Sequence, residues 1–282
     1  MTFLPRKRRR QILNVVMLGM TAAFTLLTVS VLFFVLGYLV VKGGTSLNLA
    51  FFTELPRPAG ETGGGMANAL LGSAKMLAVA AITGLPVGLL AGLYLSEFAG
   101  RTMAASVRYA ADLLNGMPSI VIGIFVYTLV VLPMKQFSTL AGGLALGVMM
   151  IPIMTRSTEE FLRAVPLSLR EASLALGASR TLTIIRVVLP AASRGIVTAA
   201  MLGLARVAGE TAPLLFTALS NAFWSPGILH PTASLPVMIY NYAVSPYDDW
   251  HRQAWAAGLV LLTLVLVANL GARRLLGGHR QA

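Results

Sequence analysis

The stretch "REASLALGASRTLTIIRVVLP" occupies residues 170–190 and places three arginines and a glycine between two long apolar segments. Ser168 followed by Glu171 fits a capping box, in which the hydroxyl and the carboxylate each accept a backbone N–H at the start of a helix. Gly177 is expected to end this helix, because glycine adopts the left-handed conformation of a helix terminus without steric cost. A first short helix is therefore predicted from Ser168 up to Gly177.

A second short helix is expected after this glycine. Ser179 is a suitable N-cap for it, and the helix is predicted to end before Pro190. The small residues Ala172, Ser173 and Ala175 give the first helix a shallow surface, which permits close approach of another protein. The stretch thus predicts a helix–turn–helix hairpin that presents a docking surface.

The composition of the chain indicates a membrane protein. Hydrophobic residues make up 56% of the sequence and charged residues 11%, and the mean hydropathy is +0.77. Because the chain has no cysteine and only three scattered histidines, it offers no disulfide framework, thiolate redox centre or evident metal site. The net charge of +12 does not favour nucleic acid as a partner, since the basic residues are spread between apolar segments. Membrane lipid is the expected surrounding.

Apolar runs of about 20 residues are long enough to cross a bilayer as helices. The sequence contains roughly six of them, at residues 15–41, 67–95, 113–133, 139–156, 194–219 and 253–272. An even number of spans places both termini on the same side. We therefore expect an all-α integral membrane protein with about six transmembrane helices.

The distribution of Lys and Arg predicts the orientation of these spans. With the N-terminus inside, 16 basic residues fall on the cytoplasmic side and four fall outside, in agreement with the positive-inside rule. Residues 1–14 are then a basic cytoplasmic N-terminus, 42–66 an external loop, 157–193 a cytoplasmic loop and 276–282 a cytoplasmic tail. The hairpin and both termini are therefore expected in the cytoplasm.

The hairpin resembles the EAA motif of ABC-importer permeases, which reads Glu-Ala-Ala, three residues, Gly, nine residues, Ile, any residue, Leu-Pro. The matching residues are Glu171, Ala172, Gly177, Leu189 and Pro190, while Ser173 replaces the second Ala and Val187 the Ile. In that family the loop docks on the ATP-binding subunit. A hairpin that merely lies on the membrane is the alternative, but it does not explain the spacing to Leu189 and Pro190.

Further stretches resemble the PstA-type permeases of phosphate-specific ABC importers. They include "LAGLYLSEFAG" (90–100), "ARVAGETAPLL" (205–215) and "SLPVMIYNYA" (234–243). The resemblance implies a type I (MetI-like) permease domain at 67–275 in a bacterial inner membrane, with inorganic phosphate as substrate. It also implies as partners a PstC-type second permease, a cytoplasmic ABC ATPase dimer and an external phosphate-binding protein. Closure of the ATPase dimer would then push the coupling hairpin and turn the cavity from inward- to outward-facing.

Two ionisable residues are predicted inside the fifth span. Arg206 lies about halfway along it, and Glu210 follows at i+4 on the same helical face. Pro213 leaves the carbonyl of residue 209 without its helical donor, so a kink is expected. Arg206 and Glu210 are either a neutralising structural pair or part of a phosphate pathway, in which the guanidinium meets the oxyanion. Lys75 lies in the second span and either contacts substrate or only snorkels to the interface.

The sequence indicates no catalytic site in this chain. It has no G-x-x-x-x-G-K-[ST] phosphate cradle, so ATP and Mg²⁺ are expected on a separate ATPase, and no cofactor is expected here. A permease for another oxyanion, such as molybdate or sulfate, is one alternative function. A passive anion channel or a membrane scaffold is an alternative of a different class. The chain is therefore interpreted as a non-catalytic subunit of a translocase.

Overall fold

The computed structural model describes residues 6–277 of the 282-residue chain. Parts of the predicted N-terminal segment 1–14 and of the predicted tail 276–282 lie outside these residues. No strand occurs among the described residues. The helical elements, in chain order, are α1 (Arg6–Gly44), α2 (Leu49–Thr53), α3 (Ala67–Glu97), α4 (Arg101–Gly116), α5 (Ser119–Val126), the π-helical turn η1 (Tyr127–Val131), α6 (Leu132–Met134), α7 (Thr139–Arg163), α8 (Leu167–Ala175), α9 (Arg180–Thr183), the π-helical turn η2 (Ile184–Val188), α10 (Leu189–Ala208), α11 (Ala212–Thr217), α12 (Leu235–Ala243) and α13 (Asp248–Gly277).

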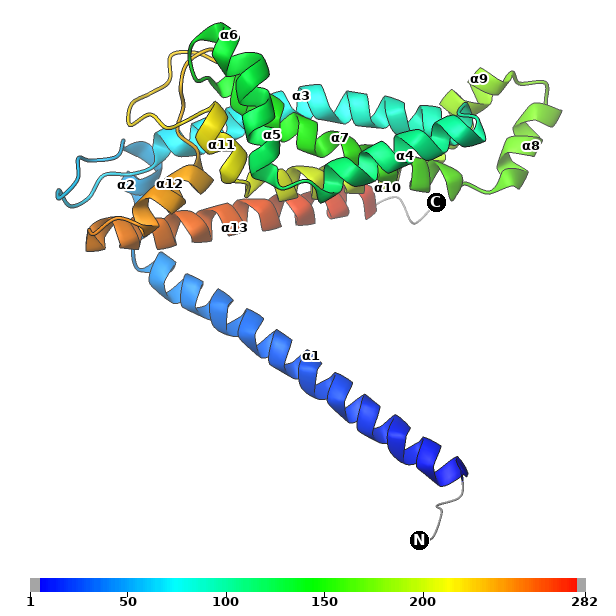
Figure 1. The fold of residues 1–282 in the computed structure, drawn as a ribbon, viewed down its shortest axis with the longest axis horizontal. Helices are drawn as coiled ribbons and strands as arrows, with labels where there is room; N and C mark the ends of the chain where they lie inside the picture. The colour runs from blue at the N-terminus through cyan, green and yellow to red at the C-terminus, as the bar shows by residue number, and fades with distance from the viewer. Residues whose placement is uncertain (1–5, 278–282) are drawn as a thin grey trace.

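Within the described residues, five continuous helices are long and apolar enough to cross a membrane, and a bent pair of helices brings the number to six. The long helices of the main body run roughly side by side in Figure 1. Four of the predicted spans lie within single helices of the structure, namely α1, α3, α7 and α13. The prediction of an all-α membrane protein with about six spans is confirmed.

The third predicted span, 113–133, is wrong as a single straight helix. It covers the end of α4 and nearly all of the helical stretch Ser119–Met134, which consists of α5, η1 and α6. The two helical stretches meet at an angle of 101°. The break lies at Met117 and Pro118, where Met117 is extended with ψ 138° and Pro118 caps α5. A proline clashes with a helical conformation of the preceding residue, so the helix ends before the proline and restarts in a new direction.

The fifth predicted span, 194–219, also differs from the structure. One continuous helical stretch covers Arg180–Ala208, and the shorter α11 follows after a break at residues 209–211. Pro213 lies in the first turn of α11, where its missing N–H costs no helical hydrogen bond. The helix is therefore interrupted at residues 209–211, and the prediction of a mere kink is wrong.

Glycines allow α3 and α7 to pack in close contact along much of their length. A β-carbon at Gly84 would lie 2.6 Å from the carbonyl oxygen of Gly147, and one at Gly88 would lie 2.4 Å from the β-carbon of Met154. Together with Gly92, these residues are spaced by four on one face of α3, the pattern that lets transmembrane backbones approach closely. The two helices form the centre of the bundle.

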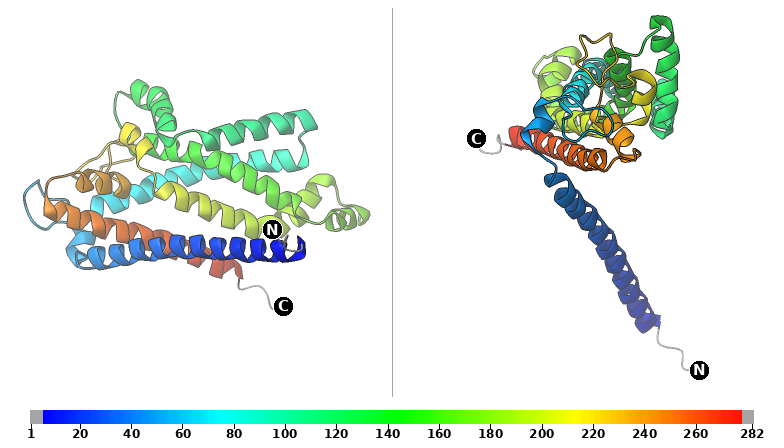
Figure 2. Two further views of the ribbon diagram at one scale, coloured as in Figure 1. Left: turned by 60° about the horizontal axis from the view of Figure 1, so that its bottom comes forward. Right: turned by 90° about the vertical axis from the view of Figure 1, so that its left-hand side faces the viewer.

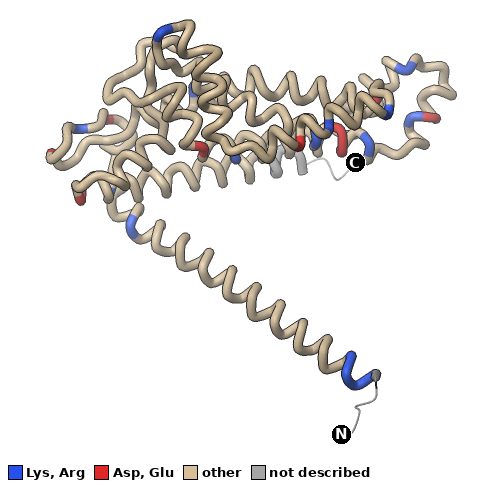
Figure 3. The backbone as a smooth tube through the Cα atoms, in the orientation of Figure 1, with Lys and Arg blue, Asp and Glu red and all other residues tan. Residues whose placement is uncertain are grey.

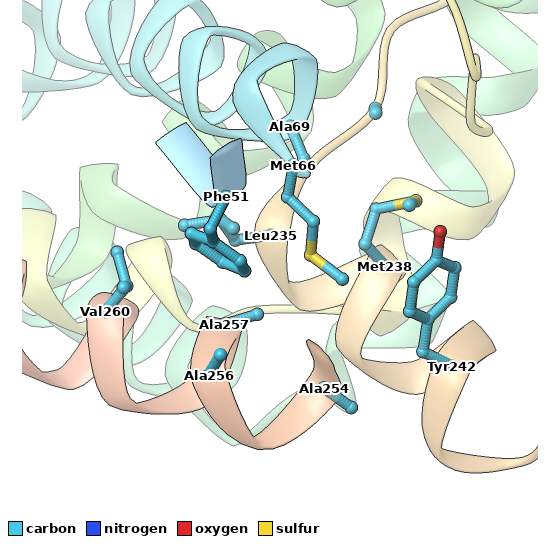
Figure 4. Close-up of a cluster of buried hydrophobic side chains, with 11 residues drawn as sticks. Phe51, Met66, Ala69, Leu235, Met238, Tyr242, Ala254, Ala256, Ala257 and Val260 are labelled. Carbon is cyan, nitrogen blue, oxygen red and sulfur yellow. The ribbon is translucent and has the colours of Figure 1, made fainter. Parts of the chain in front are cut away.

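A second packed region lies at the end of the bundle that is opposite to α8 and α9. Figure 4 shows Phe51 of α2, Met66, Leu235 of α12 and Ala257 of α13 converging in one cluster of buried side chains. Phe51 is 1% exposed and Met66 is fully buried. Phe51 of α2 and residues 64–66 at the end of the following loop are thus packed parts of the fold, while residues 57–63 of that loop are exposed.

The helix α1 stands away from the bundle, as Figures 1 and 2 show. Only the C-terminal end of α1 contacts the described part of the bundle, at α13. There the ring centres of Tyr38 and Trp255 lie 5.1 Å apart in an edge-to-face arrangement. No residue of its apolar window is buried. Most of α1 is therefore available to lipid or to another subunit.

Charged residues gather at the end of the bundle that carries α8 and α9, which is visible in Figure 3. Glu159 of α7 has only 4% of its side chain exposed there, and Arg108 of α4 lies 2.6 Å from its carboxylate. Arg163 lies 3.0 Å and Arg156 3.5 Å from the same group. Because a buried carboxylate requires charged partners, this cluster fixes α4 against α7.

Candidate functional site

The predicted hairpin is formed by α8, a turn at Gly177 and α9. Gly177 has φ +82°, in the left-handed region. Its N–H donates to the carbonyl of Leu174 at 3.0 Å, and the N–H of Ala178 donates to the carbonyl of Ser173 at 3.2 Å. These two bonds make up a Schellman motif, so the prediction that Gly177 ends the first helix is confirmed.

The predicted capping box at Ser168 and Glu171 is wrong. The helix α8 begins at Leu167, its N-cap is Pro166, and no side chain caps it. The proline has the extended ψ of an N-cap, 139°, so the N-cap lies two residues earlier than expected. Ser168 therefore lies inside the first turn, and the exposed side chain of Glu171 makes no hydrogen bond or ion pair within residues 6–277.

The second arm begins as predicted but continues further. The hydroxyl of Ser179 accepts the N–H of Leu182 at 3.3 Å, so Ser179 is the N-cap of α9. The expected end before Pro190 is wrong, because the chain passes through η2 into α10 without interruption. The wider π-helical turn accommodates a proline, which lacks the N–H of the regular helical ladder. The hairpin is therefore continuous with a membrane-spanning helix.

The residues of the EAA-like motif divide between a free surface and the junction with α10. Glu171, Ala172, Gly177 and Pro190 are exposed, and Ser173, Val187 and Leu189 are half-buried. The hydroxyl groups of Ser173 and Thr183 lie 2.9 Å apart and join the two arms. Leu176 at the tip is 90% exposed. The tip of the hairpin thus presents small and apolar groups that no part of the described chain covers.

Arg206 and Glu210 do not share a helical face, contrary to the prediction. Arg206 lies in the last turn of α10, which ends at Ala208 with Gly209 as its C-cap, so Glu210 falls outside the helix. Within the described residues neither side chain has a hydrogen bond or an ion pair; Arg206 is exposed and Glu210 half-buried. Both remain beside the break between α10 and α11, and their role in a pathway remains a prediction.

Lys75 lies in the first third of α3. Its half-buried ammonium donates to the carbonyl oxygen of Ser225, 3.4 Å away, in the segment between α11 and α12. Asn68, about two turns before Lys75 in α3, donates to the carbonyl oxygen of Asn221 at 2.7 Å. Lys75 therefore holds this segment against α3 in the single chain.

The residues that attach the hairpin to the bundle are not among the predicted site residues. Arg170 of α8 forms an ion pair of 2.7 Å with Glu97, the last residue of α3, and Arg180 of α9 contacts the same region. Glu97 lies within the quoted stretch 90–100. The available sequence signal was an acidic residue directly after the predicted span 67–95. Its partner could not be identified, because 73 residues separate Glu97 from Arg170.

Comparisons with known proteins agree with this architecture. The model of the family described as "Binding-protein-dependent transport system inner membrane component" matches residues 84–277. The chain is similar to a phosphate transport system permease protein PstA of Yersinia pestis, with 46% identity over 83% of this chain and 80% of that one. A PstA protein of Haemophilus influenzae is 42% identical over 92% of both chains. Among solved structures, an inward-facing MetNI methionine ABC transporter has a TM-score of 0.64, at 21% identity, covering 77% of this chain and 96% of that one.

Proposed function

The chain belongs to the family of binding-protein-dependent transport system inner membrane components, and we propose that it is the PstA-type permease subunit of an ATP-driven phosphate importer. The observation that carries this assignment is the identity, over most of the chain, to permeases named for phosphate transport. The fold supports it, since the solved structures with a similar fold include ABC importers. The protein thus works as a transport subunit in a multi-pass inner-membrane complex.

The exposed tip of the hairpin is the proposed docking element for the cytoplasmic ATPase. Glu171, Ala172, Ser173 and Gly177 belong to this surface, and Val187, Leu189 and Pro190 form its junction with α10. Because η2 and α10 continue the second arm, a displacement of the tip reaches a membrane-spanning helix directly. The ATPase dimer binds ATP and Mg²⁺ in this proposal and supplies the displacement.

The proposed substrate pathway passes the break between α10 and α11. An exposed arginine at membrane depth is costly in lipid, so Arg206 faces a second subunit or a watery cavity. Its planar guanidinium suits the oxygens of phosphate, and Glu210 nearby limits how tightly the anion is held. A PstC-type permease completes the cavity, and an external phosphate-binding protein delivers inorganic phosphate to it.

Reconstitution of the chain with a PstC-type permease, the ATPase and the binding protein tests the proposal. Radiolabelled phosphate is expected to accumulate in the vesicles only with ATP and the ATPase. Stronger competition by molybdate or sulfate than by unlabelled phosphate would assign the subunit to another oxyanion. Phosphate entry without the ATPase would identify a passive channel. Absence of phosphate entry under every condition would favour the alternative that the chain is a membrane scaffold.

A further inference from the structure

The first arm of the hairpin is held to the bundle by one half-buried arginine, Arg170. A terminal nitrogen of Arg170 lies 2.7 Å from each carboxylate oxygen of Glu97 in α3. The other terminal nitrogen donates to the carbonyl oxygen of Leu162 in α7, also at 2.7 Å. The Glu97 and Arg170 side chains are 5% and 19% exposed. One side chain of α8 is thereby fixed to the ends of two spans.

The second arm is attached at the same place. Arg180 of α9 donates to the backbone carbonyl oxygen of Glu97. Its guanidinium also lies over the ring of Phe98, 5.1 Å from the ring centre. Since Ser173 and Thr183 join the two arms, the whole hairpin is held at residues 97 and 98.

These contacts control the angle of α8. The chain joins α8 to α7 only through the three residues 164–166, and a linker of this length allows a short helix to pivot. The chain provides no direct connection between α8 and α3. The side chains of Arg170 and Arg180 supply that connection, and they attach to a helix that is closely packed on α7.

We propose that Glu97 is a positioning residue for energy coupling. It turns the hairpin into a rigid lever, so that a push by the ATPase moves α3 and α7 together and is not absorbed at the linker 164–166. A buried ion pair contributes little net stability, whereas loss of one partner leaves an uncompensated charge. The pair is therefore better suited to fixing geometry than to stabilising the fold. This inference rests on the proposed function, because it requires an ATPase that acts on the hairpin.

The test compares phosphate import with ATP hydrolysis in the complete reconstituted complex. Glu97→Gln is expected to retain ATP hydrolysis and complex assembly, while the phosphate imported per ATP hydrolysed falls about fivefold or more. Asp112→Asn is the matched control, because Asp112 forms an exposed ion pair with Arg156 at the same end of the bundle. The control is expected to keep the wild-type ratio of import to hydrolysis.

A purely structural role for Glu97 would lower the amount of complex and leave this ratio unchanged. An unchanged ratio in Glu97→Gln, measured per assembled complex, would overturn the proposal. Should this variant fail to assemble, Arg170→Lys provides the second test, because a single ammonium cannot hold Glu97 and Leu162 with the same geometry. A wild-type ratio in Arg170→Lys would also overturn the proposal. A wild-type complex that imports no phosphate with ATP would contradict the proposed function itself.

Discussion

The electrostatic surroundings of Arg206 depend on where its helix ends. It lies in the last turn of α10, where the partial negative charge of the helix terminus favours a cation. Glu210 lies beyond the helix and forms no ion pair with it. The charge of Arg206 is therefore not neutralised within the described chain, and it remains available to an anion or to another subunit.

Substitutions of Arg206 are expected to affect transport more than assembly. Arg206→Gln should abolish phosphate uptake while the complex still forms, and Arg206→Lys should retain at most part of the uptake because it loses the planar fork. Uptake is measured per assembled complex, with Arg57→Gln as control, because Arg57 is an exposed arginine in the loop between α2 and α3. Since Glu210 is not paired with Arg206, adding Glu210→Gln should not restore uptake. Recovery in the double variant would show that Arg206 has a structural role.

Gly177 provides a second test at the residue scale. A β-carbon at Gly177 meets nothing within 4 Å, so only the positive φ opposes substitution, at a cost of about 1 kcal/mol. The Gly177→Asp variant is expected to be present in the membrane in normal amounts but to lose ATP-driven uptake and ATPase binding. Gly177→Asn is the matched control, because it has nearly the same shape and tolerates this φ without the charge. Wild-type uptake by Gly177→Asp would contradict the docking assignment.

Local chemistry made part of the hairpin predictable. Gly177 and Ser179 were identified because their roles depend on neighbours within a few residues. The capping assignment of Glu171 failed because Pro166 is also a strong start signal, and it lies two residues before Ser168. The partner of Glu97 was unpredictable, since it is set by the packing of distant helices.

At the scale of elements, continuous apolar runs were predictable and their interruptions were not. A hydropathy window averages over short breaks, so it extended one span across Pro118 and another across Gly209. Both breaks have local signals in the sequence. The first contains Pro118, and the second begins at Gly209 and is followed by Pro213. The glycines at 84, 88 and 92 likewise marked the packed face of α3, but their partners on α7 could not be derived from one sequence.

Gly88 tests the close contact between α3 and α7. Gly88→Ala would place a β-carbon 2.4 Å from that of Met154, so the helices must move apart at a cost of about 1–3 kcal/mol. At Gly203 in α10 the nearest atom would be 3.7 Å away, and Gly203→Ala should be neutral or stabilising by up to about 1 kcal/mol. Thermal unfolding of the purified complex distinguishes the two variants. Equal stability of both would contradict the close packing at Gly88.

At the scale of the whole molecule, the structure separates two groups of surfaces. The hairpin and most charged residues lie at one end, and the loops beside α2 and α12 lie at the other (Figures 1 and 3). The helix α1 extends away from the bundle and is almost entirely exposed (Figure 2). This arrangement suits a subunit that meets an ATPase at one end, a binding protein at the other and a second permease or lipid along its side.

The predicted orientation of the two ends is directly testable, because the chain contains no cysteine. Single variants at exposed positions are proposed: Arg8→Cys near the N-terminus, Leu176→Cys at the hairpin tip and Glu61→Cys in the loop before α3. A membrane-impermeant maleimide should label Glu61→Cys in intact cells and should label the other two only after permeabilisation. The cysteine-free parent chain supplies the background. Labelling of Arg8→Cys in intact cells would reverse the topology, and the hairpin could then no longer reach a cytoplasmic ATPase.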